Sequence, residues 1–254
     1  MKRRIALILT AFLLATLPCL SQQDAPPAPE ELPHARSAIG ITVGGTYSMH
    51  SGGLQFPREA PPHILYDEAS GLGPSFGVRA QFPLMPTLAL SPRLFAECRG
   101  GSFTSEPFVM EIIGKDLRPQ DLRLEDELDA VLRLGGLDLL LTWAPMDNGL
   151  YFAAGPSIAL RLYEEFRVTG RILSPDGVTF LDGSTEKEFY DDDPGITRSL
   201  HLGLRAGAGY QLALNQDLAL GLETLYLYPL QSVTENDDWT LQGLQATLTL
   251  LFLL

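Results

Sequence analysis

Residues 199–212, SLHLGLRAGAGYQL, decide the fold because they alternate between two kinds of residue over their whole length. Leucine, alanine and tyrosine occupy the even positions from Leu200 to Leu212, and small, polar or charged residues occupy the odd ones. A period of two is typical of a β-strand, whose successive side chains point to opposite faces. Globular strands usually have about five or six residues, whereas a strand that crosses a bilayer needs about ten tilted ones. Repetition of this pattern would therefore predict a membrane β-barrel.

Seven further stretches show the same alternation. They span residues 38–48, 72–84, 88–99, 128–143, 151–162, 218–228 and 239–254. In 128–143 the apolar residues change parity, so we place a β-bulge at Gly135 and Gly136. Together the eight stretches predict an all-β fold, an eight-stranded antiparallel up-and-down transmembrane β-barrel.

The connections between these stretches alternate between long and short. The long ones are residues 49–70, 100–127, 164–197 and 229–238, and the connections near 85, 147 and 215 are short. At the end of the second long connection, residues 116–128 could form a short helix. This asymmetry is typical of outer-membrane barrels. Aromatic residues of the apolar face gather at both strand ends, as interfacial girdles do. The girdle at the short turns would hold Phe82, Trp143, Phe152, Tyr210 and Phe252, and the other Tyr47, Tyr226, Tyr228 and Trp239.

The apolar face is therefore expected to contact lipid. The alternative is a soluble lipocalin-like barrel with this face inside, but the opposite face holds Gly, Ser, Thr and Arg, which could not fill a dry core.

The first residues have the features of a signal peptide. Lys2, Arg3 and Arg4 precede an apolar run, and cleavage is expected after Ser21. Lipidation of Cys19 is the alternative. The expected organisation is a signal peptide at 1–21, a proline-rich leader at 22–35 and an outer-membrane barrel domain at 36–254. No later segment has eighteen consecutive apolar residues, which excludes a helical membrane span.

Charge and cysteine content exclude several classes of partner. Removal of residues 1–21 takes three basic residues and no acidic one, which changes the formal net charge from −13 to −16 and argues against nucleic acid as a partner. Only Cys98 remains, so an internal disulfide and a zinc motif are excluded. We expect no cofactor and no metal centre.

Over residues 38–254 the chain resembles the bacterial outer-membrane β-barrel family, specifically the small eight-stranded OmpA-like or PorT-like barrels. The resemblance rests on the strand pattern, the signal peptide and the C-terminal strand ending LTLLFLL, although the family's assembly signal usually ends in an aromatic residue and here only Phe252 could serve. It implies a location in the bacterial outer membrane, contact with outer-membrane lipid, use of the barrel assembly machinery and a monomeric state. No peptidoglycan-binding domain is expected after the barrel.

An eight-stranded barrel is just wide enough for its own side chains, so a large pore is not expected. Ten charged residues fall on the predicted inward face, where they would form a salt-bridged plug. These are Arg79, Arg93, Glu97, Arg99, Asp129, Arg133, Asp138, Arg161, Arg205 and Glu223. A turn centred near Leu214 would pair Arg205 with Glu223. Arg79 would face Arg93, which requires an acid between them or makes a small anion site.

Three activities compete with a purely structural or interaction role. The first is a lipid A-modifying enzyme, with His201 and Ser199 inward near one loop and His50 beside Ser48 and Ser51 near another, although such residues could simply line the wet barrel mouth. The second is Ca²⁺ binding by Asp191, Asp192 and Asp193, although a charge run is usually just solvated. The third is an adhesin or receptor role of the long loops. We expect a structural or interaction role and no enzymatic activity.

Overall fold

The computed structural model describes residues 36–55, 65–113, 118–146, 148–192, 195–235 and 238–254. Two compact units divide the chain, Met1–Glu30 and Glu31–Leu254. The expected signal peptide and leader, residues 1–35, lie outside the described residues. Among those described, none lies in a helix long and apolar enough to cross a membrane.

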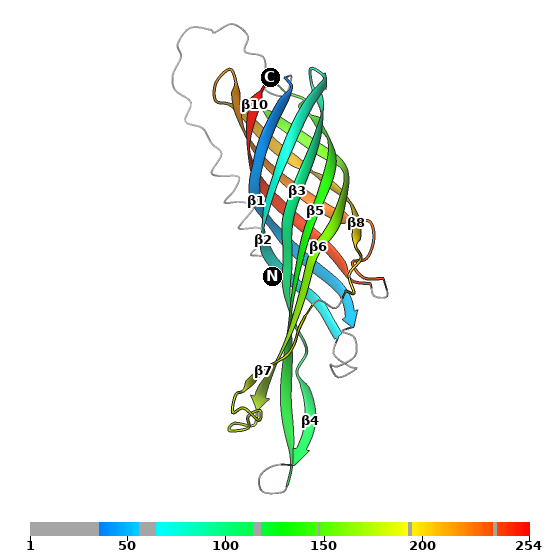
Figure 1. The fold of residues 1–254 in the computed structure, drawn as a ribbon, viewed down its shortest axis with the longest axis vertical. Coiled ribbons are helices and arrows are strands. Elements are labelled where there is room, and N and C mark those ends of the chain that lie inside the picture. The colour runs from blue at the N-terminus through cyan, green and yellow to red at the C-terminus, as the bar shows by residue number, and fades with distance from the viewer. Residues whose placement is uncertain (1–35, 56–64, 114–117, 147, 193–194, 236–237) are drawn as a thin grey trace. The chain divides into compact units, whose positions relative to one another are not determined.

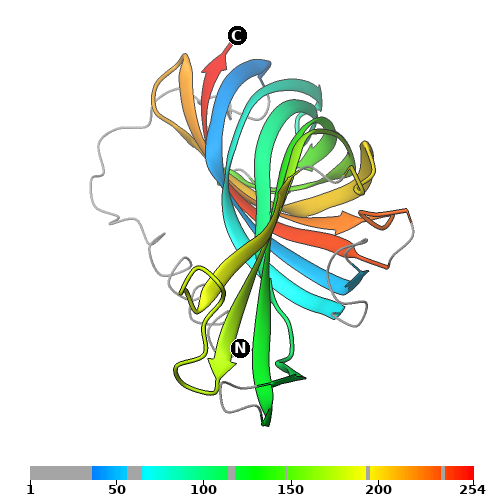
Figure 2. The same ribbon diagram turned by 60° about the horizontal axis from the view of Figure 1, so that its bottom comes forward.

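Ten β-strands make up the described part of the second unit (Figure 1). They are β1 (Ala38–Gln55), β2 (Leu65–Met85), β3 (Leu88–Thr104), β4 (Phe108–Ile113), β5 (Pro119–Trp143), β6 (Leu150–Ser174), β7 (Glu186–Asp192), β8 (Leu200–Ala213), β9 (Leu218–Pro229) and β10 (Thr240–Leu253). Eight of them close a ring in the order β1, β2, β3, β5, β6, β8, β9 and β10, with β10 paired to β1 (Figure 2). Every pairing is antiparallel, which confirms the predicted eight-stranded barrel.

The remaining strands belong to an extension of the barrel wall. Strands β5 and β6 are 25 residues each, more than twice the length that crosses a bilayer. β4 pairs with the first residues of β5 and β7 with the last part of β6. We call β4, residues 119–127 of β5, residues 166–174 of β6 and β7 the extension. The predicted helix at 116–128 is wrong, because its described residues from Pro119 onward are strand.

The outer face of the barrel carries the predicted apolar band. The girdle at the short turns is confirmed, since Phe82, Trp143, Phe152, Tyr210 and Phe252 are 43–51% exposed. At the loop end Tyr47, Tyr226 and Tyr228 are partly or largely exposed, but Trp239 is fully buried. Its assignment to the outer girdle is wrong.

The predicted β-bulge at Gly135 and Gly136 is also wrong. Even-numbered residues of β5 are buried on both sides of these glycines, so the strand keeps one inward face. The irregularity lies instead in β6, where the register shifts opposite Arg133 and Leu134 and leaves Leu162 without a partner. Leu162 packs over Gly135, since a Cβ built there would lie 2.9 Å from its side chain.

Because β5 keeps one inward face, the interior of the barrel has apolar layers on both sides of a charged one. At the loop end, side chains of β5 and β6 meet those of other strands in an apolar cluster of Tyr66, Phe103, Leu128, Ala130, Leu132, Phe166, Val168, Val233, Trp239 and Leu241. We call this the upper cluster, although the loop end of the barrel points downward in Figure 1. Along β5, the inward-facing residues are apolar as far as Leu134 and charged at Asp138. They are apolar again from Leu140, which belongs to a second cluster toward the short turns. The charged residues lie between the two.

Candidate functional site

Seven charged side chains form one continuous chain in the middle of the barrel. Their order is Arg99, Glu97, Arg205, Asp138, Arg93, Glu223 and Arg79, so cations and anions alternate. Each is at most 4% exposed. We call this set the ion chain.

The contacts of the ion chain are short and mostly hydrogen-bonded. Glu97 Oε1 accepts from Arg99 Nε at 2.9 Å and from Arg205 Nη2 at 3.0 Å. Arg205 Nε lies 3.1 Å from Asp138 Oδ1 but donates instead to Ser157. Asp138 Oδ2 accepts from Arg93 Nη2 at 2.6 Å. Such charge-assisted bonds are what burial of a charge requires.

Glu223 closes the other half of the ion chain. Its Oε1 accepts from Arg93 Nη1 at 3.2 Å and its Oε2 from Arg79 Nη1 at 3.0 Å. Arg79 and Arg93 are register partners on β2 and β3, as predicted. The acid that their opposition requires is therefore Glu223 from β9, and the alternative of an anion between them is wrong, because a carboxylate occupies that position.

Neutral residues complete the hydrogen bonding of these charges. Tyr151 Oη lies 3.0 Å from Arg79 Nη1 and donates to Glu223 at 2.9 Å. Its ring fits because Gly209 has no side chain: a Cβ there would lie 2.3 Å from the ring. Gln245 contacts both Arg205 and Glu97, and the Arg205 guanidinium lies 4.3 Å from the centroid of the Phe95 ring. In the sequence, the only signal for these neutral partners of the ion chain is their position on the predicted inward face.

Three of the ten predicted interior charges lie elsewhere. Asp129 and Arg133 point outward, because β5 keeps its parity, and their inward assignment is wrong. Asp129 accepts a hydrogen bond from Ser102, and Arg133 lies over the ring of Tyr163 at 4.8 Å. Arg161 is half-buried at the loop end, where it contacts Glu164 at 2.6 Å and Thr197.

The predicted Arg205–Glu223 ion pair is wrong. Ala213 pairs with Ala219, so the β8–β9 turn is centred two residues later than expected. Asn215 Oδ1 accepts from the backbone of Asp217 and Leu218, which fixes this longer turn. Arg205 therefore lies opposite Leu227 and pairs across the lumen instead.

The histidines predicted for catalysis make no hydrogen bond to an acid or a serine hydroxyl among the described residues. His50 Nε2 is 3.0 Å from the carbonyl of Gly100, its ring stacks on Trp239, and its Nδ1 has no partner. His201 is hydrogen-bonded to the backbone of Arg198, and its Nε2 is buried without a partner. Ser199 is exposed and precedes β8. Among the described residues the structure therefore does not assemble a His–Ser–acid set.

The acidic residues of the loop end show two contrasting environments. Burial raises the pKa of Asp126 in the extension, and burial together with the Asp126 charge raises the pKa of Tyr66. Hydrogen bonds from Ser184 lower the pKa of the fully exposed Asp182.

The calcium candidates fall at the end of β7. Asp191 and Asp192 pair in register with Arg167 and Phe166, and Asp193 lies outside the described residues. No group of three or more His, Cys, Asp or Glu that could hold a metal ion occurs among the residues that the structure describes.

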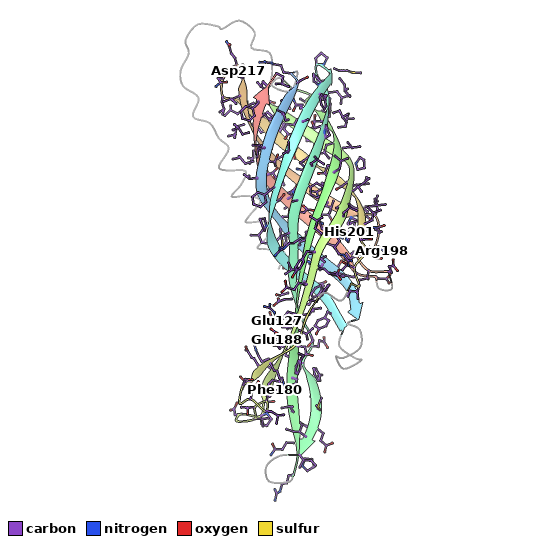
Figure 3. The ribbon with its side chains drawn as sticks, viewed as in Figure 1. Glu127, Phe180, Glu188, Arg198, His201 and Asp217 are labelled. Atoms are coloured by element: carbon purple, nitrogen blue, oxygen red, sulfur yellow. The ribbon has the colours of Figure 1, made fainter. Side chains whose placement is uncertain are left out.

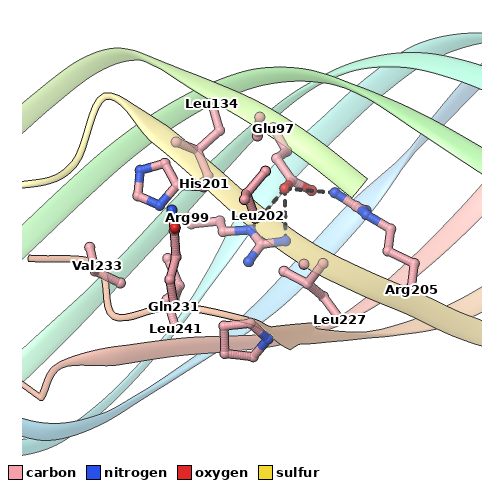
Figure 4. A pocket seen from close by; sticks show the side chains of 13 residues that line it. Glu97, Arg99, Leu134, His201, Leu202, Arg205, Leu227, Gln231, Val233 and Leu241 are labelled. Carbon is pink, nitrogen blue, oxygen red and sulfur yellow. Dashed lines mark hydrogen bonds and ion pairs between the residues drawn. The ribbon is translucent and has the colours of Figure 1, made fainter. Parts of the chain in front are cut away.

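The described residues form a cavity inside the barrel and a hollow in its wall. The cavity, of about 30 Å³, lies beside Arg99, Arg205 and His201 (Figure 4). It has room for one or two water molecules. The hollow, of about 300 Å³, is lined by residues of β2, β3, β5 and β6, where Gly100 has no side chain.

A family model described as outer membrane protein beta-barrel domain matches residues 21–235. Neisserial surface protein A is similar in structure at 9% identity, with 84% of this chain and 97% of that chain covered and a TM-score of 0.33. Ail, the attachment invasion locus protein of Yersinia pestis, has 8% identity, coverages of 85% and 99%, and a TM-score of 0.31.

The outer membrane protease OmpT from Escherichia coli has 9% identity, coverages of 86% and 97%, and a TM-score of 0.32. No curated protein matches the sequence.

Proposed function

Because the chain belongs to the outer-membrane β-barrel protein family and lies in the bacterial outer membrane, we propose that it is a closed, monomeric barrel that presents its extension to partners outside the cell. Contact with outer-membrane lipid and with the barrel assembly machinery during biogenesis is part of this proposal. The observation that carries it is the continuation of β5 and β6, 25 residues each, into a four-stranded sheet beyond the ring.

A filled interior supports a role that does not depend on transport. β3 and β9 lie on opposite sides of the ring, and Arg93 and Glu223 from these strands are 3.2 Å apart. The upper cluster lies on the loop side of this contact, and the described interior cavity is only about 30 Å³. Side chains of an eight-stranded barrel are expected to fill its lumen in this way.

The extension supports a role in binding. Glu127, Glu188 and Phe180 lie along it (Figure 3). Its sheet combines exposed ion pairs, Arg171–Glu186 and Arg167–Glu188, with exposed apolar side chains. The latter are Val109, Met110, Ile113, Leu173 and Phe189. Apolar side chains exposed next to charges are common where proteins meet partners.

A lipid A-modifying enzyme has less support. The four ring nitrogens of His50 and His201 contact backbone groups or have no partner, and none contacts a carboxylate or a serine hydroxyl in the described structure. A general base needs a partner that orients it.

The experiment that tests the proposal compares bacteria producing the full chain with bacteria producing a trimmed one. In the trimmed variant, residues 107–124 and 172–190 are replaced by short Gly-Ser linkers, which shortens β5 and β6 but leaves their ring segments in place. Both should fold, as shown by gel migration that changes on boiling. Adhesion of the bacteria to immobilised serum proteins and to one another should be lost in the trimmed variant. Equal adhesion by both would contradict the proposal.

A further inference from the structure

The ion chain carries an uncompensated positive charge. It contains four arginines but three carboxylates, because an alternating chain of seven that begins and ends with arginine has one more cation than anions. Arginine stays protonated in proteins. Of the other buried acids, Glu164 pairs with Arg161 at the loop end, and Asp126 lies in the extension. A buried charge without a counter-charge is costly, so this excess calls for an anion.

The two ends of the ion chain differ in what surrounds them. Arg79 has Tyr151 Oη at 3.0 Å and Ser91 Oγ at 3.3 Å besides Glu223, and the hollow beside it has no room for a water molecule. Arg99, by contrast, pairs with Glu97 alone among the described carboxylates and lines the cavity of about 30 Å³. Space and excess charge thus coincide at Arg99.

A second polar group at this cavity also needs a partner. His201 lies beside Arg99 in Figure 4, and both line the cavity together with Gln231. The Nε2 atom of His201 is buried and has no hydrogen-bond partner among the described residues. Because Nδ1 is hydrogen-bonded to the backbone of Arg198, Nε2 is a donor only when the ring carries its second proton, and it then adds to the positive charge of Arg99. Apolar residues such as Leu134 and Leu241 form other parts of the wall.

We propose that the cavity beside Arg99 and His201 binds one chloride-sized monovalent anion, which completes the alternation of the ion chain. The small volume selects the ligand: a monatomic anion fits, whereas sulfate, phosphate or a lipid headgroup does not. The bound anion accepts from Arg99, brings the charges of the ion chain to four positive and four negative, and thereby stabilises the barrel. This site does not depend on the proposed role of the extension.

Thermal unfolding of the folded, detergent-solubilised protein tests the site at constant ionic strength. Sodium gluconate is replaced stepwise by sodium chloride or bromide, and the folded fraction is followed by heat-modifiable gel migration. The unfolding temperature should rise by about 3–6 °C for each tenfold increase in chloride above its dissociation constant. A wild-type unfolding temperature that does not depend on chloride would overturn the proposal.

Two variants separate the site from a general salt effect. Arg99→Gln removes the excess charge and should abolish the chloride dependence. Arg133→Gln removes an arginine next to the register partner of Arg99 but on the outer face, and should keep the dependence. Equal dependence in both would exclude the site. Should Arg99→Gln fail to fold, anomalous scattering from bromide-soaked wild-type crystals decides: a bromide peak at Arg99 supports the site, and its absence refutes it.

Discussion

At the scale of single residues, Glu223 shows how two opposed arginines are accommodated in the interior. Its two oxygens separately bind Arg79 and Arg93, which face each other in register and would otherwise repel. Tyr151 adds a hydrogen bond to Oε2, the oxygen that binds Arg79. One carboxylate from the far side of the ring therefore lets two opposed arginines remain buried.

Substitution of this carboxylate should be strongly destabilising. In Glu223→Gln the two arginines keep their charges and lose their common counter-charge, so we expect a loss of about 3–5 kcal/mol in the free energy of unfolding. Urea unfolding of the protein folded into lipid vesicles measures it. The matched control is Glu188→Gln, whose pair with Arg167 is about half exposed and should cost less than about 1 kcal/mol. Equal losses in the two variants would contradict the role given to Glu223.

At the scale of the strand, β5 shows where alternation in the sequence misleads. The leucines before Gly135 have even numbers, whereas Leu137, Leu139 and Leu141 have odd ones, and a single lipid-facing stripe would require a bulge between them. The strand stays regular, because its leucines before Gly135 face inward and those at 137, 139 and 141 face lipid. Alternation reports that the two faces differ, but it does not report which face is inside when the interior is itself apolar.

This reversal predicts different effects for two leucines of β5. Leu132 is fully buried in the upper cluster and Leu139 is 43% exposed on the outer face. Leu132→Ala should lower the free energy of unfolding by about 2–5 kcal/mol because it leaves a cavity. Leu139→Ala should cost less than about 2 kcal/mol, since its side chain is only partly packed. Urea unfolding of both variants tests this. A larger loss of unfolding free energy for Leu139→Ala than for Leu132→Ala would contradict the inward position of Leu132.

At the scale of the whole molecule, the number of strands in the ring, their antiparallel direction and the lipid-facing band were predictable from the sequence. They follow from length and period, which the bilayer and the closed ring impose on every strand. Contacts across the lumen were not. Arg205 meets Glu97 and Asp138 instead of Glu223, because a two-residue change in one turn moves every partner and because sequence spacing says nothing of strands opposite in the ring.

The extension was missed for a related reason. Residues 100–127 and 164–197 have the polar, charged character of loops, yet β4 to β7 pair in them as a sheet outside the ring. Their strands bury only part of one face, so the sequence carries little apolar alternation there. Leu122, Leu124, Phe166 and Val168 are the buried apolar exceptions.

The central claim, a barrel closed by the ion chain and the upper cluster, is tested most directly by planar-bilayer conductance of the purified folded protein. Side chains from opposite strands meet in the middle of the lumen, so the wild-type protein should form no stable channels at any applied voltage that the bilayer tolerates. Large, stable conductance steps that appear with the folded protein would contradict a closed interior.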